Sequence, residues 1–255
     1  MNPTQDAGAA PATTETMLTG KSILVTGGGS GLGAALCRTL ADAGANIVVG
    51  DTKRDNAYAL AEEIRSRNGA AQAMEFDVAD PLAAERAIAA TVEVFGKIDV
   101  LINNAGTDVT CAIDELSYEQ WDRVIRTNLY GPFLLTRLAA RHMKRQGGGQ
   151  IVNIASTAAK RCWPNASAYH ASKFGLLGFS HAMHAELRPH NIKVTAVVAG
   201  GMRTPFLLDR FPDIDLANLQ DPVNVARAVM QVLMLPEDTV IPEITVLPMR
   251  ETSWP

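Results

Sequence analysis

The chain has 255 residues, of which 47% are hydrophobic and only 5% aromatic, and its formal net charge is −4. This length suits one large α/β domain or two small ones. The abundance of alanine and aliphatic residues favours helices packed on a buried sheet. Because the charge is acidic and no basic block stands out, nucleic acid and anionic membranes are excluded as expected partners.

The first 19 residues are rich in Ala, Thr and Pro and predict a flexible N-terminal tail. This segment lacks the positive start and apolar core of a signal peptide, and no apolar run approaches the ~20 residues of a membrane-spanning helix. Three widely spaced cysteines form neither a disulfide framework nor a zinc site, which indicates a reducing compartment. We therefore expect a cytoplasmic protein.

Short apolar or β-branched runs alternate with longer segments of helical period, which is typical of repeated βαβ units. The predicted strands cover residues 22–26, 46–50, 71–76, 98–103, 150–154, 193–198 and 243–247. The predicted helices cover residues 32–43, 55–68, 81–95, 118–145, 166–188 and 222–233. Asp80 and Pro81 make a good start for the third helix. The pattern predicts an α/β fold: a Rossmann-like doubly wound, mostly parallel seven-stranded sheet with helices on both faces.

A glycine-rich turn, TGGGSGLG over residues 26–33, follows the first predicted strand and opens the first predicted helix. Such a turn lets backbone N–H groups approach a pyrophosphate at the N-terminus of the helix. A loose dinucleotide fingerprint passes through Gly29, Gly31 and Ala34, although glycine clusters also form ordinary flexible turns. The position between strand and helix favours cofactor binding.

Asp51 ends the second strand about 20 residues further on, where an acid can hydrogen-bond the ribose 2′-OH of a dinucleotide. In isolation it reads as a loop acid or helix cap, but the glycine turn favours the cofactor. A carboxylate also repels a 2′-phosphate, so NAD is favoured over NADP. Ser30 agrees with this preference, whereas Lys53 and Arg54 argue for the added phosphate.

Tyr169 and Lys173 stand four residues apart at the start of a predicted helix, on the same face. The ordinary tyrosine pKa is about 10, and a neighbouring lysine charge lowers it. A Tyr-x-x-x-Lys pair is common by chance, but this one follows the fifth strand at the sheet edge where a dinucleotide binds. Ser156 lies at the same edge, where its hydroxyl can hold a substrate oxygen.

Taken together, these motifs resemble the classical short-chain dehydrogenase/reductase family from about residue 21 to residue 247. The family's Thr-Gly-x-x-x-Gly-x-Gly is matched at Thr26, Gly27, Gly31 and Gly33, and its Asn-Asn-Ala-Gly at residues 103–106. Ser156 precedes Tyr169 by thirteen residues, as the family pattern asks. Asn128, Asp77 with Val78, and the segment AGGMRT at residues 199–204 match further motifs in order.

The resemblance implies a single dinucleotide-binding catalytic domain over residues 20–255. It implies four catalytic residues, Asn128, Ser156, Tyr169 and Lys173. The implied cofactor-binding positions are Thr26, Gly27, Gly29, Ser30, Gly31, Leu32, Gly33, Asp51, Asp77, Val78, Asn104, Ala105, Gly106, Tyr169, Lys173, Gly200, Met202 and Thr204. No metal is expected.

The chemistry that the resemblance implies is hydride transfer between the nicotinamide and a secondary alcohol or ketone. Lys173 is expected to lower the pKa of Tyr169, which then acts as general acid/base. Ser156 is expected to position the substrate oxygen, and Asn128 to support a water relay. Two departures concern structure rather than chemistry: Ala199 replaces the family's usual proline, and the end of the chain lacks its frequent glycine-rich ending.

Three other functions stay open at this point. A non-catalytic dinucleotide sensor would need the glycine turn but not the four catalytic residues. An enoyl reductase of the same fold usually spaces its tyrosine and lysine further apart, and a sugar epimerase of the extended branch generally needs a longer chain.

The substrate cannot be identified from the sequence, but its pocket is expected at Asp108, Val109, residues 157–163 and residues 202–219. Lys160 and Arg161 could meet an acidic substrate by their position between Ser156 and Tyr169, but a solvent-facing position is favoured for both. Residues 210–219 suggest a lid, because the segment is loop-like yet apolar. By resemblance, the helices at residues 118–145 and 166–188 pair subunits into a tetramer or dimer.

Overall fold

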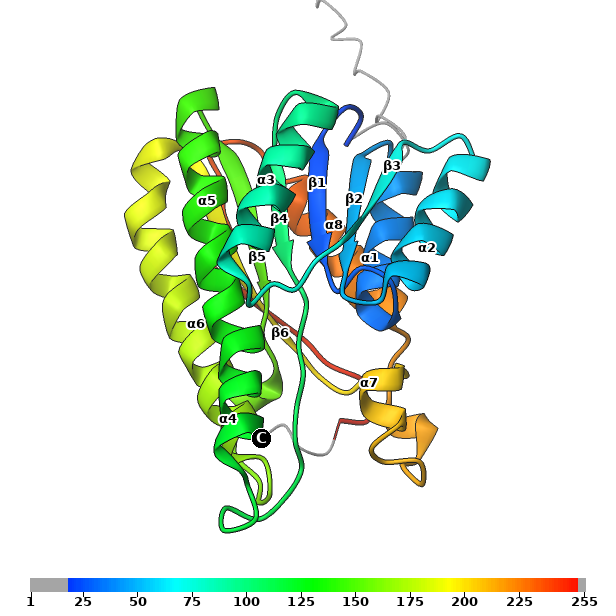
Figure 1. The fold of residues 1–255 in the computed structure, drawn as a ribbon, viewed down its shortest axis with the longest axis vertical. Helices are drawn as coiled ribbons and strands as arrows, with labels where there is room; N and C mark the ends of the chain where they lie inside the picture. Colours follow the sequence, from blue (N-terminus) through cyan, green and yellow to red (C-terminus); the bar gives the residue numbers. More distant parts are fainter. Residues whose placement is uncertain (1–17, 252–255) are drawn as a thin grey trace, which may run out of the picture.

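The computed structural model describes residues 18–251, which form a layered α/β structure (Figure 1). Within this part of the chain, seven strands make one sheet in the order β3-β2-β1-β4-β5-β6-β7, and every neighbouring pair is parallel. The strands are β1 Ser22–Thr26, β2 Asn46–Asp51, β3 Ala71–Glu75, β4 Val100–Asn103, β5 Gly149–Ile154, β6 Ile192–Ala199 and β7 Glu243–Val246. The predicted doubly wound sheet is confirmed, and it is wholly parallel.

The central strands are buried on both faces, which explains their continuous apolar runs. In β1, Ile23 and Val25 face one core together with their neighbours in β2 and β4, whereas Leu24 faces the other. The predicted strand at residues 98–103 begins only at Val100, because the Asp99 carboxylate accepts a hydrogen bond from the backbone N–H of Ser22, 2.8 Å away. The predicted strand bounds are otherwise within one residue of the structure.

Helices cover both faces of the sheet (Figure 1). The first core contains residues of α1, α2 and α8, and the second contains residues of α3 and α5 and the end of α6. Their bounds are α1 Gly31–Asp42, α2 Arg54–Ser66, α3 Pro81–Phe95, α5 Gly131–Gln146, α6 Ser167–Leu187 and α8 Pro222–Leu233. The predicted start of α3 is present: Asp80 accepts from the backbone N–H of Leu82, and Pro81 is the first helical residue.

The predicted continuous helix at residues 118–145 is wrong. It divides into α4 (Tyr118–Ile125), a π-helical turn (Arg126–Tyr130) and α5. The π-helical turn contains Asn128, whose buried side chain hydrogen-bonds to groups outside the helix. Such turns recur at functional sites because they re-aim a side chain within a helix.

The ends of the described region also carry information. Residues 1–17 of the predicted N-terminal tail lie outside the described residues, and Leu18 is buried with its N–H donating to the carbonyl of Ala43. Among residues 18–251, no helix combines the length and apolar composition that crossing a bilayer requires.

The predicted loop-like lid contains a short 3-10 turn, Leu216–Asn218, and follows an unpredicted short helix, α7 (Pro205–Leu208).

Candidate functional site

A cavity of about 1050 Å³ opens at the carboxyl ends of the strands. In a doubly wound sheet, this edge is where ligands bind, at the point where the strand order reverses between β1 and β4. Most of the predicted site residues line the cavity: Gly27, Ser30, Gly31, Leu32, Gly33, Asp51, Asp77, Val78, Asn104, Ala105, Gly106, Ser156, Tyr169, Lys173, Gly200, Met202 and Thr204. Segments from six strands and both faces of the sheet therefore converge on one space.

Three predicted site residues, Thr26, Gly29 and Asn128, lie outside the cavity lining and hold residues that belong to it. The Thr26 hydroxyl accepts hydrogen bonds from the backbone N–H groups of Asn104 and Ala105, both at 3.0 Å. The Asn104 amide in turn donates to the carbonyls of Thr26 and Gly27. These bonds join the end of β1 to the end of β4.

The glycine turn is shaped by close backbone approaches rather than by flexibility. Gly27 and Gly31 have φ values of 61° and 51°, in the left-handed region that favours glycine. A Cβ on Gly33 would lie 1.9 Å from the carbonyl oxygen of Gly27, so no side chain fits there. The helix α1 can therefore begin directly against the turn, with its N-terminus at the cavity.

Asp51 is fixed at the end of β2 by two backbone donors. One carboxylate oxygen accepts from the N–H of Gly29 at 2.9 Å, and the other accepts from the N–H of Lys53 at 2.9 Å. The same side chain thus lines the cavity and secures the glycine turn. It keeps acceptor capacity on both oxygens, since each carboxylate oxygen has two lone pairs.

Asp77 and Val78 follow β3 and form one end of the cavity. The Asp77 carboxylate accepts from the N–H of Ala79 at 2.8 Å, which folds the backbone into a turn. Val78 is buried against Gly131, where an added Cβ would lie 2.8 Å from a Val78 methyl group. The glycine at the start of α5 therefore allows this helix to pack directly against Val78 at the end of the cavity.

Asn128 is fully buried and holds the loop after β4. Its Oδ1 accepts from the N–H of Thr107 at 2.8 Å, and its Nδ2 donates to the carbonyl of the same residue at 2.8 Å. Nδ2 also donates to the Ser172 hydroxyl at 3.0 Å, and that hydroxyl donates to the carbonyl of Tyr169 at 2.7 Å. The loop at Thr107 is thereby tied to the first turn of α6.

Tyr169 and Ser156 face each other in the cavity. Burial raises the pKa of Tyr169 to about 12, while a hydrogen bond from Ser156 opposes this rise. Ser156 is itself oriented at the start of a 3-10 turn, Thr157–Ala159, where its hydroxyl accepts from the N–H of Ala158 at 3.2 Å. A hydroxyl pair of this kind can hold one oxygen atom of a ligand.

Lys173 lies one helical turn after Tyr169 and is also buried. Its Nζ donates to the carbonyl of Ile154 at 2.8 Å and lies 5.7 Å from the centre of the Tyr169 ring. Burial lowers the pKa of Lys173 to about 8, against the opposing charge of Asp108. Desolvation of the phenolate by burial is the largest influence on the pKa of Tyr169 and raises it.

Phe206 and Arg210 belong to the segment at residues 202–219, where the sequence predicts part of the substrate pocket, and both line the cavity. The Phe206 ring centre lies 5.9 Å from that of Tyr169, and the Arg210 guanidinium lies 3.9 Å over the Phe206 ring. Arg210 Nη1 is 3.2 Å from a carboxylate oxygen of Asp108, the residue after Thr107. Figure 1 places α7 beyond the carboxyl ends of the strands, where this segment covers the cavity.

The hypothesis that Lys160 and Arg161 meet an acidic substrate is not supported. Neither residue lines the cavity, and Lys160 pairs with Glu243 of β7 at 2.5 Å. His170, beside Tyr169, instead shapes the cavity wall: its Nδ1 bonds the carbonyl of Ala158, and its Nε2 accepts from the N–H of Trp163. The Trp163 side chain then lies against the His170 ring and lines the cavity.

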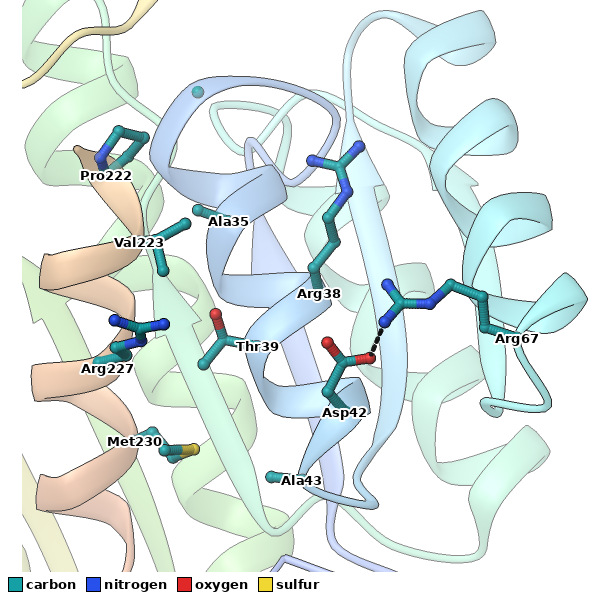
Figure 2. A pocket seen from close by; sticks show the side chains of 11 residues that line it. Ala35, Arg38, Thr39, Asp42, Ala43, Arg67, Pro222, Val223, Arg227 and Met230 are labelled. Atoms are coloured by element: carbon teal, nitrogen blue, oxygen red, sulfur yellow. Dashed lines mark ion pairs between the residues drawn. The ribbon is translucent and has the colours of Figure 1, made fainter. Parts of the chain in front are cut away.

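A second, smaller cavity of about 490 Å³ lies between α1 and α8 (Figure 2). Figure 2 shows Arg67 and Asp42 pointing toward one another, and their charged atoms lie 2.9 Å apart. Arg38 pairs with Glu63 through two hydrogen bonds. This cavity contains none of the predicted catalytic residues, and two of its three arginines are already neutralised by acids.

Residues 21–215 match the family model of the short chain dehydrogenases. The chain belongs to this family. The match covers the glycine turn, the loop after β4 and the helix that carries Tyr169 and Lys173. The matched range ends before α8 and β7.

Known relatives of this short-chain dehydrogenase agree with the assignment. An uncharacterised oxidoreductase from Thermotoga maritima is 38% identical over 188 residues, covering 74% of this chain and 73% of the relative. A D-threitol dehydrogenase from Mycolicibacterium smegmatis is 39% identical over 180 residues, covering 71% of this chain and 69% of the relative. The crystal structure of a short-chain type dehydrogenase/reductase from Mycobacterium marinum superposes with a TM-score of 0.85 at 28% identity, covering 92% and 97% of the two chains.

Proposed function

We propose that this chain transfers a hydride between NAD and a small secondary alcohol or its ketone. The observation that carries the proposal is the convergence of Ser156, Tyr169 and Lys173 on the cavity into which the glycine turn opens. Membership of an oxidoreductase family supports the reaction class. The roles assigned to individual residues are part of this proposal.

The residues present fit a dinucleotide. Gly27, Gly31 and Gly33 leave the backbone bare at the N-terminus of α1, where a pyrophosphate is favoured by free N–H groups and the helix dipole. Asp51 stands where a ribose hydroxyl binds, and Val78 lies in the wall for the adenine. Met202 and Thr204 line the same cavity as Tyr169 and would meet the nicotinamide. When bound, the nicotinamide supplies the hydride chemistry.

The chain's own residues orient the substrate and move the proton. Ser156 and Tyr169 hold the substrate oxygen between their hydroxyl groups, and Tyr169 takes or gives the hydroxyl proton. Lys173 supplies a cation beside the phenol, and its Nζ is anchored by the carbonyl of Ile154. Asn128 positions the loop at Thr107 and the first turn of α6, which keeps these groups in register.

The preference for NAD over NADP rests on Asp51. Its carboxylate is held by Gly29 and Lys53 at the cavity wall, where an added 2′-phosphate would meet a fixed negative charge. We expect Asp51→Asn to retain the two backbone contacts in part and to reduce the discrimination against NADP. Fluorescence titration of NADH and NADPH against both proteins measures this directly.

An uncharged alcohol as substrate agrees with the lining of the cavity and with the name of one relative. The D-threitol dehydrogenase acts on a polyol by its name. The cavity that contains Tyr169 is lined by apolar side chains, such as Phe206 and Trp163, and by polar side chains, such as Ser156 and Asp108. The segment around α7 lines the part of the cavity beside Tyr169, where the substrate would lie.

Nicotinamide absorbance during incubation with alcohols and ketones tests the function. Purified full-length enzyme is assayed with NAD(H) and NADP(H) against a panel of secondary alcohols, polyols, hydroxy acids and ketones. Tyr169→Phe removes only the phenolic oxygen, so we expect NADH to bind and turnover to fall by at least about 100-fold. Turnover that survives this substitution contradicts the assignment, and tight NADH binding without any turnover favours the non-catalytic sensor.

We also propose that the chain assembles through the face formed by α4, α5 and α6. Large hydrophobic side chains remain exposed there, among them Trp121, Phe133 and Phe174, each at least 40% exposed. A contiguous apolar face of this kind is typical of an interface. Light scattering after gel filtration distinguishes a dimer or tetramer from a monomer, and Phe133→Asp with Phe174→Asp is expected to shift the mass downward.

A further inference from the structure

The loop after β4 and the segment around α7 meet at an ion pair beside the proposed catalytic residues. Asp108 and Arg210 approach to 3.2 Å, and both are largely buried, with side chains 9% and 22% exposed. Both line the same cavity as Ser156 and Tyr169. A buried ion pair adds little net stability by itself, so its position in a ligand cavity calls for another explanation.

The pair is held in place from both sides. Asp108 follows Thr107, whose N–H and carbonyl are both bonded by Asn128. Arg210 stacks on Phe206, which contacts Tyr169, and Tyr169 is linked back to Asn128 through Ser172. The contacts form a closed ring around the cavity, so the charged groups face the ligand at a fixed distance from the tyrosine.

Both members keep unused hydrogen-bonding capacity. The Asp108 carboxylate accepts from Val109 N–H at 2.7 Å and forms an ion pair with Arg210, which leaves acceptor capacity on both oxygens. The Nη2 of Arg210 donates to the carbonyl of Phe206, but its Nε is buried and has no partner within the described residues. The guanidinium carries five N–H donors, so donors other than Nε remain for a group in the cavity.

The chemistry of this arrangement selects one kind of group. A hydroxyl can donate to the Asp108 carboxylate and accept from the Arg210 guanidinium at the same time. A carboxylate can only accept, and it would be repelled by Asp108. An alkyl group would satisfy neither charge and would remove both from water.

We propose that Asp108 and Arg210 are a specificity pair that recognises a second, uncharged hydroxyl group next to the reacting carbinol carbon. The preferred substrates are therefore vicinal diols and related polyols or hydroxy ketones, rather than simple alcohols or hydroxy acids. This inference rests on the proposed function, because it takes the reacting oxygen to lie at Ser156 and Tyr169.

Three four-carbon alcohols separate the possibilities, because they share the reacting CH₃–CHOH group. Butane-2,3-diol carries the second hydroxyl, butan-2-ol lacks it, and 3-hydroxybutanoate carries a carboxylate instead. For the wild-type enzyme with NAD, each stereoisomer is assayed and the best one compared. We expect the diol to exceed the other two in kcat/KM by about 10- to 100-fold, the usual effect of one hydrogen bond to a charged group.

Variants then test whether Asp108 and Arg210 cause the preference for the diol. Asp108→Ala and Arg210→Met should each lower the ratio of kcat/KM for the diol to kcat/KM for butan-2-ol by about 10- to 100-fold, mainly through the KM for the diol. Asp213→Ala is the matched control, because it removes an exposed acid from the same segment as Arg210 without touching the cavity. Circular dichroism melts confirm that each variant is folded.

Two results would overturn the proposal while leaving the proposed function intact. One is a wild-type enzyme that prefers butan-2-ol or 3-hydroxybutanoate. The other is an equal loss for all three substrates in both variants, which would make the pair only a latch for the segment around α7. Calorimetric titration of the diol and butan-2-ol into NADH-loaded enzyme provides a readout without turnover: tighter diol binding that Asp108→Ala abolishes supports the pair even where the hydride-transfer assignment fails.

Discussion

Gly33 packs its α-carbon against the carbonyl oxygen of Gly27, so closely that a methyl group at Gly33 would lie 1.9 Å from that oxygen. We expect Gly33→Ala to displace the turn, to lower the free energy of unfolding by about 3 kcal/mol or more, and to abolish NADH binding. Denaturant unfolding and NADH fluorescence measure the two effects.

Gly178 provides the matched control for this substitution. It lies exposed within α6, and a Cβ there would have no heavy atom within 4 Å. Gly178→Ala should therefore raise the free energy of unfolding by about 0.5–1 kcal/mol, since alanine is the better helix former. Similar behaviour of the two variants would mean that the close approach at Gly33 is not what shapes the turn.

The buried side chain of Asn128 should contribute strongly to the stability of the fold. Asn128→Ala leaves the N–H and carbonyl of Thr107 without their partners, and we expect a loss of about 2–4 kcal/mol in the free energy of unfolding. Asn128→Asp keeps the acceptor for Thr107 N–H but turns an oxygen toward the Thr107 carbonyl, so it should not rescue. Ser172→Ala removes the bond from Asn128 and the bond to the Tyr169 carbonyl but leaves both bonds to Thr107, so it should cost only about 1 kcal/mol. A loss for Asn128→Ala no larger than for Ser172→Ala would contradict this account.

The buried Lys173 should make the free energy of unfolding depend on pH. Burial lowers its pKa to about 8, whereas in the unfolded chain the group titrates near its ordinary 10.5. Between these values the unfolded chain holds the proton and the folded chain does not, so the free energy of unfolding contributed by Lys173 rises with pH. From about pH 8 to 10.5, the free energy of unfolding of wild type should therefore rise relative to that of Lys173→Met by roughly 3 kcal/mol in total. A constant difference across this range, measured by urea unfolding, would show that the lysine is not desolvated.

The ion pair beside Tyr169 predicts opposite shifts in a pH–rate profile. Burial is the main cause of the raised Tyr169 pKa; the Asp108 charge raises it further, and the Arg210 charge lowers it. Alcohol oxidation requires the deprotonated base, so kcat/KM rises with pH up to that pKa. Asp108→Asn should move the midpoint to lower pH, and Arg210→Met should move it to higher pH. Midpoints that move in the same direction, or not at all, would mean that another group is titrating.

The central strands were predictable because a parallel sheet buried on both faces requires continuous apolar runs, as in β1, β4 and β6. The edge strands β3 and β7 contain polar residues and were recognised from their place in the alternation of strands and helices. The cavity lining was largely predictable for a related reason. The glycine turn, Asp51, Asn104 and Ser156 each follow directly after a strand, and parallel strands bring their carboxyl ends to one edge.

The π-helical turn at Asn128 and the position of Arg210 were not predictable in the same way. Residues 118–145 have a helical period throughout, and the interruption depends on hydrogen bonds to Thr107 and Ser172, which lie 21 and 44 residues away. Arg210 meets Asp108 across about a hundred positions of the chain, and nothing in the local sequence marks either residue as the other's partner. The sign of the Tyr169 pKa shift likewise depends on burial, which the spacing of Tyr169 and Lys173 does not reveal.

Glu251 bears on how this protein can be handled. Its carboxylate accepts from the N–H of Gly201 at 3.2 Å and lines the same cavity as the proposed catalytic residues. Substitutions and fusions near this position therefore have to leave the bond between Glu251 and Gly201 intact if this wall of the cavity is to keep its shape.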